Sequence, residues 1–382
     1  MQVYLVGGAV RDQLLELPVY DRDWVVVGAT EKEMLEAGYT RADAEFPVFI
    51  HPESGEEYAL ARREEKTGPG YKGFRIYAGP DVGLEEDLLR RDLTINALAI
   101  DASGNLVDVC QGREDLDAGL LRHITPAFSE DPVRLLRIAR FAAKLGKWGF
   151  RVAHGTRALM RKMAASEDLL NLRQERIWRE MQKALSEPQP WRFFEVLQRC
   201  GVLERLIPEL DRVMERDDSH AAAEQANSLP GLQRVTGLTS DTAIRFAVTF
   251  YHAALSVDNT PMLLSRLRAG RQETERLMDL LAISHMKGSD SEPGDLLGLI
   301  SRLRPERQPE RYAAFRLACR ALWPERAEHF LAELELARDV SSTVDVKSFM
   351  QQGLAGAELG RALRSRRLEL LTKRLQEAAT DA

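Results

Sequence analysis

Two aspartates one residue apart, Asp21 and Asp23, come directly before the apolar run Trp24–Val27. In an extended strand, residues two apart face the same side, so we expect both carboxylates to point together, with Arg22 opposite. Divalent cations would relieve their mutual repulsion, and Mg²⁺ prefers carboxylate oxygens together with substrate phosphates. A pair of such ions suits in-line displacement at phosphorus. Ion pairs with nearby arginines, or an edge charge that blocks strand aggregation, would explain the same two residues.

The segment before the aspartates, VGGAVRD, places Gly7 and Gly8 between a strand-like run and a helix-like run. Glycines at such a turn let backbone N–H groups approach a phosphate, and a helix N-terminus adds a favourable field. Arg11 follows one helical turn later and can reach the same anion. A Gly-Gly pair alone is an ordinary turn, but followed by the two aspartates it indicates a triphosphate cradle beside a metal-binding strand.

Four motifs follow one another along the chain: LVGGAVRD, DRDWVVVG, RRDLTINALA (Arg90–Ala99) and EDPVRLLRIARF (Glu130–Phe141). Together they resemble the bacterial tRNA nucleotidyltransferases, or CCA-adding enzymes, of the class II branch of the polymerase β-like nucleotidyltransferases. The resemblance is strong to about residue 210 and weaker beyond, where GLAGAELGRALRSRR is similar to the family's C-terminal segment. It implies template-independent addition and repair of the 3′-terminal CCA of tRNA from CTP and ATP, with Mg²⁺ as cofactor and pyrophosphate as product.

The resemblance also implies roles for the positions that match. Asp21 and Asp23 would hold two Mg²⁺ ions, one lowering the pKa of the tRNA 3′-hydroxyl and the other neutralising the departing pyrophosphate. Glu57 is a candidate third carboxylate for this site. The residues implied to contact the nucleotide or lie near its ribose are Gly8, Arg11, Arg91, Asp92, Asn96, Arg137 and Arg140.

Asp131 and Arg134 can be interpreted from hydrogen bonding alone. Their spacing predicts that both lie on one helix face. A carboxylate only accepts and a guanidinium only donates, which suits the amino donor and ring-nitrogen acceptor of cytosine and adenine. Uracil and guanine present the reverse order, and each mismatched buried group costs about 1–3 kcal/mol. By itself the spacing favours an intrahelical ion pair, worth about 0.2–0.5 kcal/mol. Within SEDPVRLLRIARF, which carries the family resemblance, a protein template for C and A is favoured instead.

The elements that position these residues change character near residue 125. Residues 1–125 alternate strand-like and helix-like runs, so we expect an α+β fold that begins with a polymerase β-like nucleotidyltransferase head containing a small mixed sheet. We expect an all-helical neck at residues 126–205, which recognises the nucleotide base. A helical body and tail at residues 206–382 would bind tRNA.

Particular elements are predicted within this frame. Thr30 caps a helix with Glu33 at capping-box spacing, and residues 84–100 are expected to form one helix. Residues 62–81, with a glycine-rich centre at 66–73, supply a flexible loop. From Ser129, the expected N-cap of the next helix, only helical periods follow.

Composition bounds the class of protein. The chain has 382 residues, a length that indicates two or three domains. Its hydrophobic content of 44% is typical of a soluble globular protein, and its net charge is −6. No stretch is long and apolar enough to cross a membrane, and three scattered cysteines make neither a disulfide framework nor a zinc site. We expect a reduced, cytoplasmic monomer without membrane association.

Two runs of basic residues stand against the acidic average. They are either solvated helix faces or phosphate-binding surfaces that hold the acceptor arm of tRNA. The first consists of Arg134, Arg137, Arg140, Lys144, Lys147, Arg151, Arg157, Arg161 and Lys162, and the second of Arg361, Arg364, Arg366, Arg367, Lys373 and Arg374. We expect Trp148, within the first run, to belong to the core.

Some relatives carry a metal-dependent phosphohydrolase module marked by an adjacent His-Asp pair. None of the seven histidines is followed by Asp, and the best placed, His252, precedes Ala253. We therefore expect a degenerate module without metal, phosphatase or cyclic-phosphodiesterase activity. Three alternatives to CCA addition remain: a poly(A) polymerase, an enzyme that adds only CC, and a non-catalytic tRNA-binding descendant.

Overall fold

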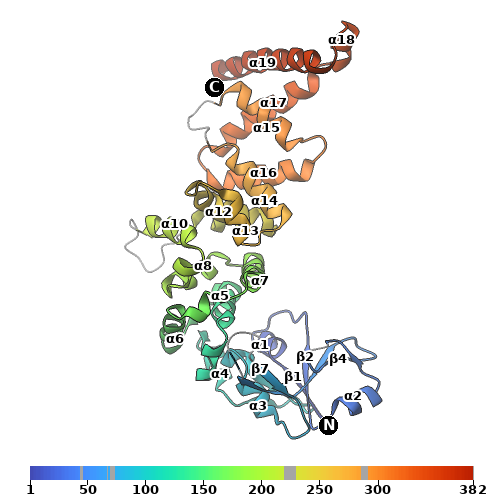
Figure 1. The fold of residues 1–382 in the computed structure, drawn as a ribbon, viewed down its shortest axis with the longest axis vertical. Helices are drawn as coiled ribbons and strands as arrows, with labels where there is room; N and C mark the ends of the chain where they lie inside the picture. Colours follow the sequence, from blue (N-terminus) through green and yellow to red (C-terminus); the bar gives the residue numbers. More distant parts are fainter. Residues whose placement is uncertain (44–45, 67, 69–73, 219–228, 285–290, 382) are drawn as a thin grey trace. The chain divides into compact units, whose positions relative to one another are not determined.

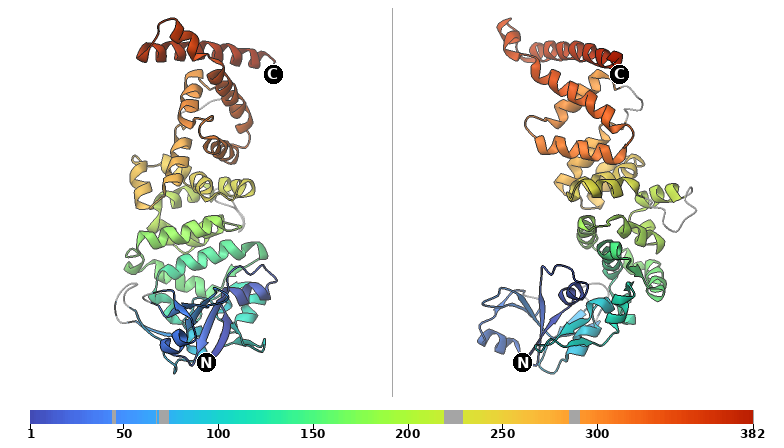
Figure 2. Two further views of the ribbon diagram at one scale, coloured as in Figure 1. Left: turned by 90° about the vertical axis from the view of Figure 1, so that its right-hand side faces the viewer. Right: turned by 180° about the vertical axis from the view of Figure 1, so that it is seen from behind.

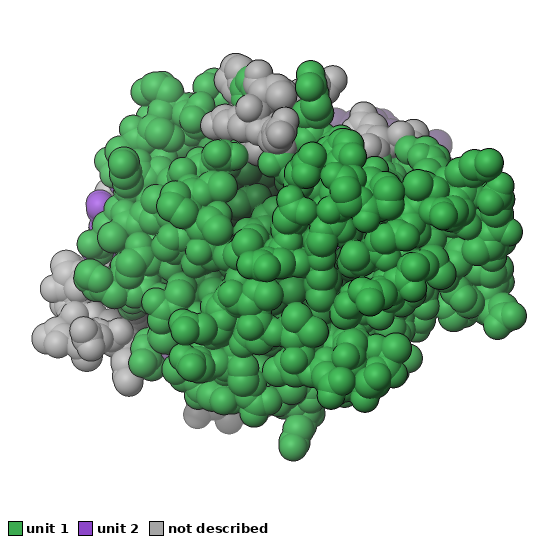
Figure 3. Space-filling view, turned by 90° about the horizontal axis from the view of Figure 1, so that it is seen from below, with its two compact units in different colours: residues 1–207 green, residues 208–382 purple. Residues whose placement is uncertain are grey.

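The computed structural model describes residues 1–43, 46–66, 68, 74–218, 229–284 and 291–381. The chain divides into two compact units, residues 1–207 and residues 208–382, which Figure 3 distinguishes by colour. The first unit combines a sheet with helices, and the described part of the second contains helices only (Figure 1). The expected α+β class, with a helical remainder, is confirmed.

A seven-stranded mixed sheet organises the N-terminal part of the first unit, in the order β3-β4-β5-β2-β1-β8-β9 (Figure 1). Its β2 strand runs parallel to β5, and the other neighbours are antiparallel. The strands are β1 (Gln2–Val6), β2 (Asp23–Val27), β3 (Thr40–Arg41), β4 (Val48–Ile50), β5 (Glu57–Leu60), β8 (Leu98–Ile100) and β9 (Leu106–Asp108).

Both faces of β2 are buried because successive valines point to opposite sides of the sheet. Val25 packs in a cluster with Val6 and Leu88, whereas Val26 packs in another with Met34 and Phe49. This run of β-branched residues therefore forms the central strand of two small cores.

The register of β1 and β2 positions the glycine turn. Val6 pairs with Asp23, so the Gly7–Gly8 turn and Asp23 lie at the same end of this antiparallel strand pair. Gly7 has φ +74°, a conformation that favours glycine, and α1 (Gly8–Leu14) follows directly. The order strand, glycine turn, helix and acidic strand is thus as expected.

The other short elements of this part include one confirmed prediction and one error. The capping box of Thr30 and Glu33 is present at α2 (Glu31–Glu36). The single helix expected over 84–100 is wrong: α3 (Leu84–Leu89) is followed by a 3₁₀ turn, η1 (Thr94–Asn96), and then by β8. Tertiary pairing overrides helical periodicity there, because β8 joins the sheet beside β1.

The stretch expected as a loop at 62–81 contains a hairpin of β6 (Arg63–Lys66) and β7 (Phe74–Tyr77). Its glycine-rich centre, residues 67 and 69–73, lies outside the described residues. The structure therefore shows the two arms of this segment, and its expected flexibility stays a prediction.

Helices and short turns complete the first unit. α5 buries an apolar face that includes Leu135, Ile138, Ala139 and Ala142, and packs on α7 and α8. The elements are α4 (Gly112–Asp117), β10 (Leu120–Leu121), η2 (Pro126–Glu130), α5 (Val133–Leu145), η3 (Gly146–Trp148), β11 (Arg151–Val152), α6 (His154–Ala164), η4 (Glu167–Leu169), α7 (Gln174–Ser186), α8 (Trp191–Arg199) and α9 (Val202–Leu206).

Two local predictions for this region are wrong. Ser129 belongs to η2 and donates to the carbonyl of Pro126, and the N-cap of α5 is Pro132. The periods after Ser129 are not all helical, because β11 pairs in parallel with β10. Two-residue strands of this kind leave no periodic signal in a sequence.

The second unit is a stack of helices, seen from two further sides in Figure 2. α12 packs on α14 and α16, and α17 packs on α15 and α19. The helices are α10 (Pro208–Asp218), α11 (Pro230–Leu238), α12 (Thr242–Leu255), α13 (Thr260–Arg266), α14 (Arg271–Leu281), α15 (Pro293–Leu303), α16 (Pro309–Leu322), α17 (Ala327–Thr343), α18 (Val346–Gln351) and α19 (Gly356–Asp381). Among the described residues of the whole chain, no helix is long and apolar enough to span a membrane.

Gly112 lets α4 approach η1, which carries site residue Asn96. A Cβ at Gly112 would lie 2.3 Å from the carbonyl oxygen of Thr94. We therefore expect Gly112→Ala to lower the free energy of unfolding by about 1–3 kcal/mol through overpacking. Thermal unfolding of the full chain, followed by circular dichroism, measures the effect.

The matched control is Gly155→Ala on α6, where a Cβ would meet nothing within 4 Å. This variant should unfold at or slightly above the wild-type temperature, because alanine is the better helix former. Equal melting temperatures for both variants would contradict the close approach at Gly112.

Candidate active site

One pocket of about 1050 Å³ lies within the first unit. Its walls come from the glycine turn, the start of β2, the β6 arm, the segment after α3, and helices α5 and α7. The residues predicted for the site that line it are Gly8, Arg11, Asp21, Asp23, Arg91, Asp92, Asn96, Asp131, Arg134, Arg137 and Arg140. Glu57 pairs with Asp23 across β5 and β2 but does not line the pocket.

Asp21 and Asp23 reach the pocket from slightly different backbone positions than expected. Asp23 opens β2, whereas Asp21 precedes the strand. Among the described residues, neither carboxylate has a hydrogen-bond or ion-pair partner, so pairing with a nearby arginine does not explain them. Desolvation in the pocket raises the pKa of Asp23; Arg91 opposes this and Asp21 adds to it.

The chemistry of this pair suits a hard divalent cation. Two neighbouring carboxylates supply oxygen ligands, and Mg²⁺ commonly takes its remaining ligands from substrate phosphates and water. No group of three or more acidic, His or Cys side chains suited to a metal occurs in the described part of the chain. The residues present therefore fit an ion that is shared with a bound substrate.

Arg11 is held inside the pocket wall. It is 2% exposed, and its Nη1 donates to Asn96 Oδ1 at 2.6 Å while its Nε donates to Asp12 Oδ1 at 2.8 Å. Asp12 in turn pairs with Lys144 of α5 at 3.0 Å. Arg11 thus joins α1 to η1, and Asp12 joins α1 to α5.

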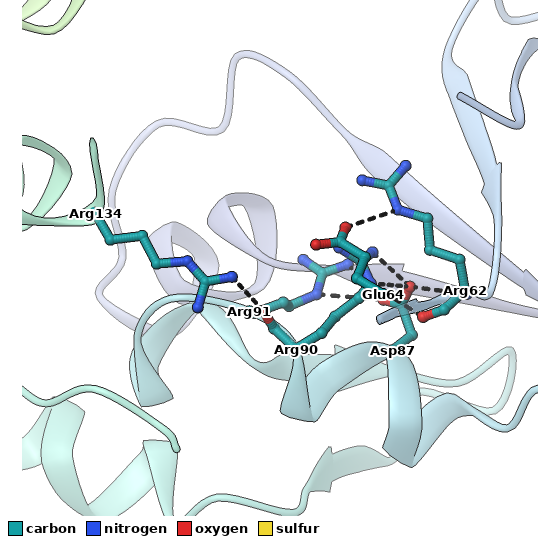
Figure 4. A network of polar contacts seen from close by, with 6 residues as sticks. All are labelled: Arg62, Glu64, Asp87, Arg90, Arg91 and Arg134. Carbon is teal, nitrogen blue, oxygen red and sulfur yellow. Dashed lines mark hydrogen bonds and ion pairs between the residues drawn. The ribbon is translucent and has the colours of Figure 1, made fainter. Parts of the chain in front are cut away.

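A second network, drawn in Figure 4, orients the RRD motif. The buried carboxylate of Asp87 accepts from Arg90 at 2.5 Å and from Arg91 at 3.1 Å. Burial alone would raise the pKa of Asp87, but these two guanidiniums lower it. Glu64 pairs with Arg90 and with Arg62 at 3.3 Å each, which ties the β6 arm to α3.

Asp92 binds Arg137 of α5 in the pocket wall. Its Oδ2 accepts from Arg137 at 2.7 Å, and its Oδ1 accepts from the Asn96 amide and the Leu93 backbone N–H. Although burial opposes ionisation, Arg137 and Asn96 lower the pKa of Asp92 to about 2. Asp92 therefore stays ionised and joins the segment after α3 to α5.

The geometry of Asp131 and Arg134 differs from the prediction. Asp131 precedes α5, so the two side chains do not share a helix face, and they form no ion pair with each other. Both oxygens of Asp131 accept from Arg176 of α7, at 3.1 and 2.8 Å. Arg134 instead donates to the carbonyls of Arg90 and Ala127, the first of which Figure 4 shows.

Helix α7 supplies a row of pocket residues that sequence reasoning missed. Its acidic member Glu180 binds Arg140 at 2.8 Å. The row consists of the N-cap residue Arg173 and, within the helix, Arg176, Arg179, Glu180 and Lys183. Their spacing of three and four residues was a usable signal, since it places charged side chains on one helix face.

The pKa of Asp92 makes a stability prediction. A folded-state pKa near 2, below the ordinary 3.8, means that its stabilisation is complete above about pH 4–5 and is lost as pH falls toward 2. We expect Asp92→Asn to lower the free energy of unfolding at pH 7 by about 2 kcal/mol. Urea unfolding at several pH values should show the difference from wild type shrinking below pH 4.

Asp117→Asn is the control, because Asp117 forms an exposed ion pair with Arg113 within α4. Its effect should stay within about 0.5 kcal/mol at every pH. A constant difference between wild type and Asp92→Asn from pH 7 to pH 3 would refute the depressed pKa.

Comparison with known proteins identifies the family. Models described as poly A polymerase head domain and as probable RNA and SrmB-binding site of polymerase A match residues 3–122 and 149–214. The Multifunctional CCA protein of Thioalkalivibrio sulfidiphilus and the CCA-adding enzyme of Pseudomonas putida are each 44% identical, over 97% of this chain and 98% of theirs. The Bacillus stearothermophilus CCA-adding enzyme, solved with CTP, shares the fold: its TM-score is 0.64 at 20% identity, over 100% of this chain and 95% of that one. The chain belongs to the bacterial CCA-adding enzymes, nucleotidyltransferases of a family that uses divalent metal ions to add the CCA end of tRNA without a template.

Proposed function

We propose that the pocket of the first unit joins CTP or ATP to the 3′-hydroxyl of tRNA, with Mg²⁺ held by Asp21 and Asp23. The observation that carries the proposal is the juxtaposition of these two carboxylates with the Gly7–Gly8 turn in one pocket. When bound, Mg²⁺ would acidify the attacking hydroxyl and neutralise charge on the phosphates. The CTP complex of the Bacillus stearothermophilus enzyme supports the nucleotide class.

The cationic walls hold the triphosphate. Ten arginines and two lysines line the pocket, against eight carboxylates, within a chain whose net charge is −6. Gly8 leaves its backbone accessible, and Arg91, oriented by Asp87, extends its guanidinium beside Gly7. Arg11, Arg137 and Arg140 act chiefly by their field, because each already binds a carboxylate of the wall.

Asp131 and Arg134 select the base. Arg134 uses two of its five N–H groups on backbone carbonyls, so three remain to donate to the base. Asp131 stays an acceptor beside it. This pairing admits the amino group and ring nitrogen of cytosine and adenine, and it opposes the carbonyl and N–H of uracil and guanine.

A basic surface outside the pocket suits the RNA backbone. Trp148, expected in the core, is 41% exposed, and the Lys147 ammonium lies 4.2 Å from its ring centroid. Arg151 and Lys162 are exposed nearby in the chain, and neither has an ion pair among the described residues. Within the second basic run, by contrast, Arg366 and Lys373 already pair with glutamates of α19.

We propose a division of labour along the chain. The head at residues 1–125 supplies the carboxylates and the phosphate cradle, the neck at 126–205 selects the base, and residues 206–382 extend the contact with tRNA. We propose that the protein carries out this reaction as a monomer. We infer that it works in the cytoplasm on tRNA.

Removal of either carboxylate tests the metal assignment. With tRNA that ends at the discriminator base, wild-type protein should add three nucleotides from CTP plus ATP and two from CTP alone. Asp21→Asn and Asp23→Asn should each lower kcat by about 10²–10³-fold, a loss expected when electrostatic stabilisation of the reacting groups is removed. Gel electrophoresis at single-nucleotide resolution measures products and rates.

Glu53→Gln, an exposed carboxylate between β4 and β5, is the matched control and should keep wild-type rates. Wild-type kinetics in Asp23→Asn would remove the metal assignment. Long A-tails from ATP alone would place the chain with the poly(A) polymerases instead.

Replacement of Lys147, Arg151 and Lys162 by alanine tests the RNA surface. We expect the Kd for tRNA to rise several-fold while kcat at saturating tRNA stays near wild type. Because each phosphate contact contributes about 0.7–0.9 to the slope of log affinity against log salt, the slope should fall by up to about 2–3. Filter binding at several salt concentrations measures both quantities.

Lys32→Ala on α2 removes one exposed positive charge from the head and should leave the slope unchanged. An unchanged slope in the triple variant would show that these three basic side chains do not contact RNA phosphates.

A further inference from the structure

The carboxylate of Asp131 is almost saturated before any nucleotide arrives. Its Oδ1 accepts from the Val133 backbone N–H at 3.1 Å and from Arg176 Nη1 at 3.1 Å. Its Oδ2 accepts from Arg176 Nη2 at 2.8 Å. A carboxylate offers about four lone-pair sites, so a single acceptor site remains, on Oδ2.

We propose that Arg176 is a positioning residue for base selection, which fixes the plane of Asp131 and leaves this one acceptor for the exocyclic amino group of cytosine or adenine. The inference rests on the proposed function, in which Asp131 and Arg134 select the base. All three side chains line the same pocket, although Arg176 lies on α7, far along the sequence.

The fork is what distinguishes Arg176 from a simple counter-charge. A planar guanidinium with two parallel N–H···O bonds fixes the carboxylate plane, because rotation about Cβ–Cγ would break both bonds at once. A carboxylate held by one contact could turn away from a facing carbonyl, or admit a water that donates to both oxygens. Held by the fork, Asp131 cannot relieve an acceptor–acceptor mismatch in either way.

Arg134 is held independently of this fork. Its guanidinium is fixed by the carbonyls of Ala127 and Arg90, whereas Asp131 is held by Arg176. Through its two hydrogen bonds to Asp131, Arg176 should act on that carboxylate. It should change how well the enzyme distinguishes an amino group from a carbonyl on the incoming base.

The test compares CTP with UTP in the first addition to tRNA that ends at the discriminator base, using the full chain. Arg176→Met should lower the CTP:UTP ratio of kcat/KM by about tenfold or more, mainly through a higher KM for CTP. Arg176→Lys, which keeps the charge but loses the fork, should fall between wild type and Arg176→Met. In an Asp131→Ala background, Arg176→Met should leave the ratio where Asp131→Ala alone sets it.

Arg113→Met is the matched control, since it removes another Arg–Asp ion pair of the first unit, on α4 outside the pocket. It should keep the wild-type ratio. A structural role for Arg176 would lower rates with CTP and UTP equally, so an unchanged ratio in Arg176→Met and Arg176→Lys would overturn the inference. A lower KM for CTP in Arg176→Met would also overturn it, by showing that Arg176 competes with the base for Asp131.

The two levels of the proposal fail separately. If Asp131→Ala keeps the wild-type CTP:UTP ratio, base selection by Asp131 is wrong and the inference falls with it. If Asp131→Ala abolishes discrimination but both Arg176 variants preserve it, only the positioning role of Arg176 is wrong. Melting temperatures of all variants, measured by circular dichroism, identify any that are not folded, and Arg176→Lys carries the test if Arg176→Met is among them.

Discussion

The first unit depends on balancing the mutual repulsion of many positive charges around one pocket. The structure meets this constraint with carboxylates placed in the walls: Asp87 between Arg90 and Arg91, Asp92 against Arg137, and Glu180 against Arg140. Removing one such acid would take a close partner from a partly buried guanidinium, which costs more than the loss of a surface ion pair. The same acids orient the arginines, so electrostatic stability and the shape of the pocket have one origin.

These pairs also join elements that the sheet alone does not hold together. Asp92 belongs to the segment after α3, and its partner Arg137 belongs to α5. Asp12 of α1 reaches Lys144 of α5, and Glu64 of the β6 arm reaches Arg90. The head and the helix that carries Arg134 are therefore linked by two ion pairs, Asp92–Arg137 and Asp12–Lys144, within one compact unit.

Much of this arrangement could be predicted from the sequence because local chemistry dictates it. The glycine turn, the capped α2 and the acidic start of β2 each have a short-range signature that survives folding. The prediction of one helix over 84–100 is wrong because β8 pairs with β1 in the sheet. A helical period in the sequence does not reveal such a pairing. The prediction that Asp131 and Arg134 share a helix face is wrong because Asp131 lies before α5. Arg176, on α7, binds Asp131 there. Contacts of that kind arise from tertiary packing, and no spacing within EDPVR predicts them.

The pairing of Val6 with Asp23 has a consequence for which length changes the chain can accept. Residues 15–19 lie between α1 and the pocket residues Tyr20 and Asp21, outside any strand, so insertions there would lengthen a surface connection at small entropic cost. A single deletion within Trp24–Val27 would be a different event. Because side chains alternate along a strand, such a deletion would shift the residues after it to the opposite face of β2. Val25 and Val26 would then no longer point into the two clusters in which they pack. Among descendants of this chain, variation in length should therefore occur before Tyr20 and be absent from Trp24–Val27.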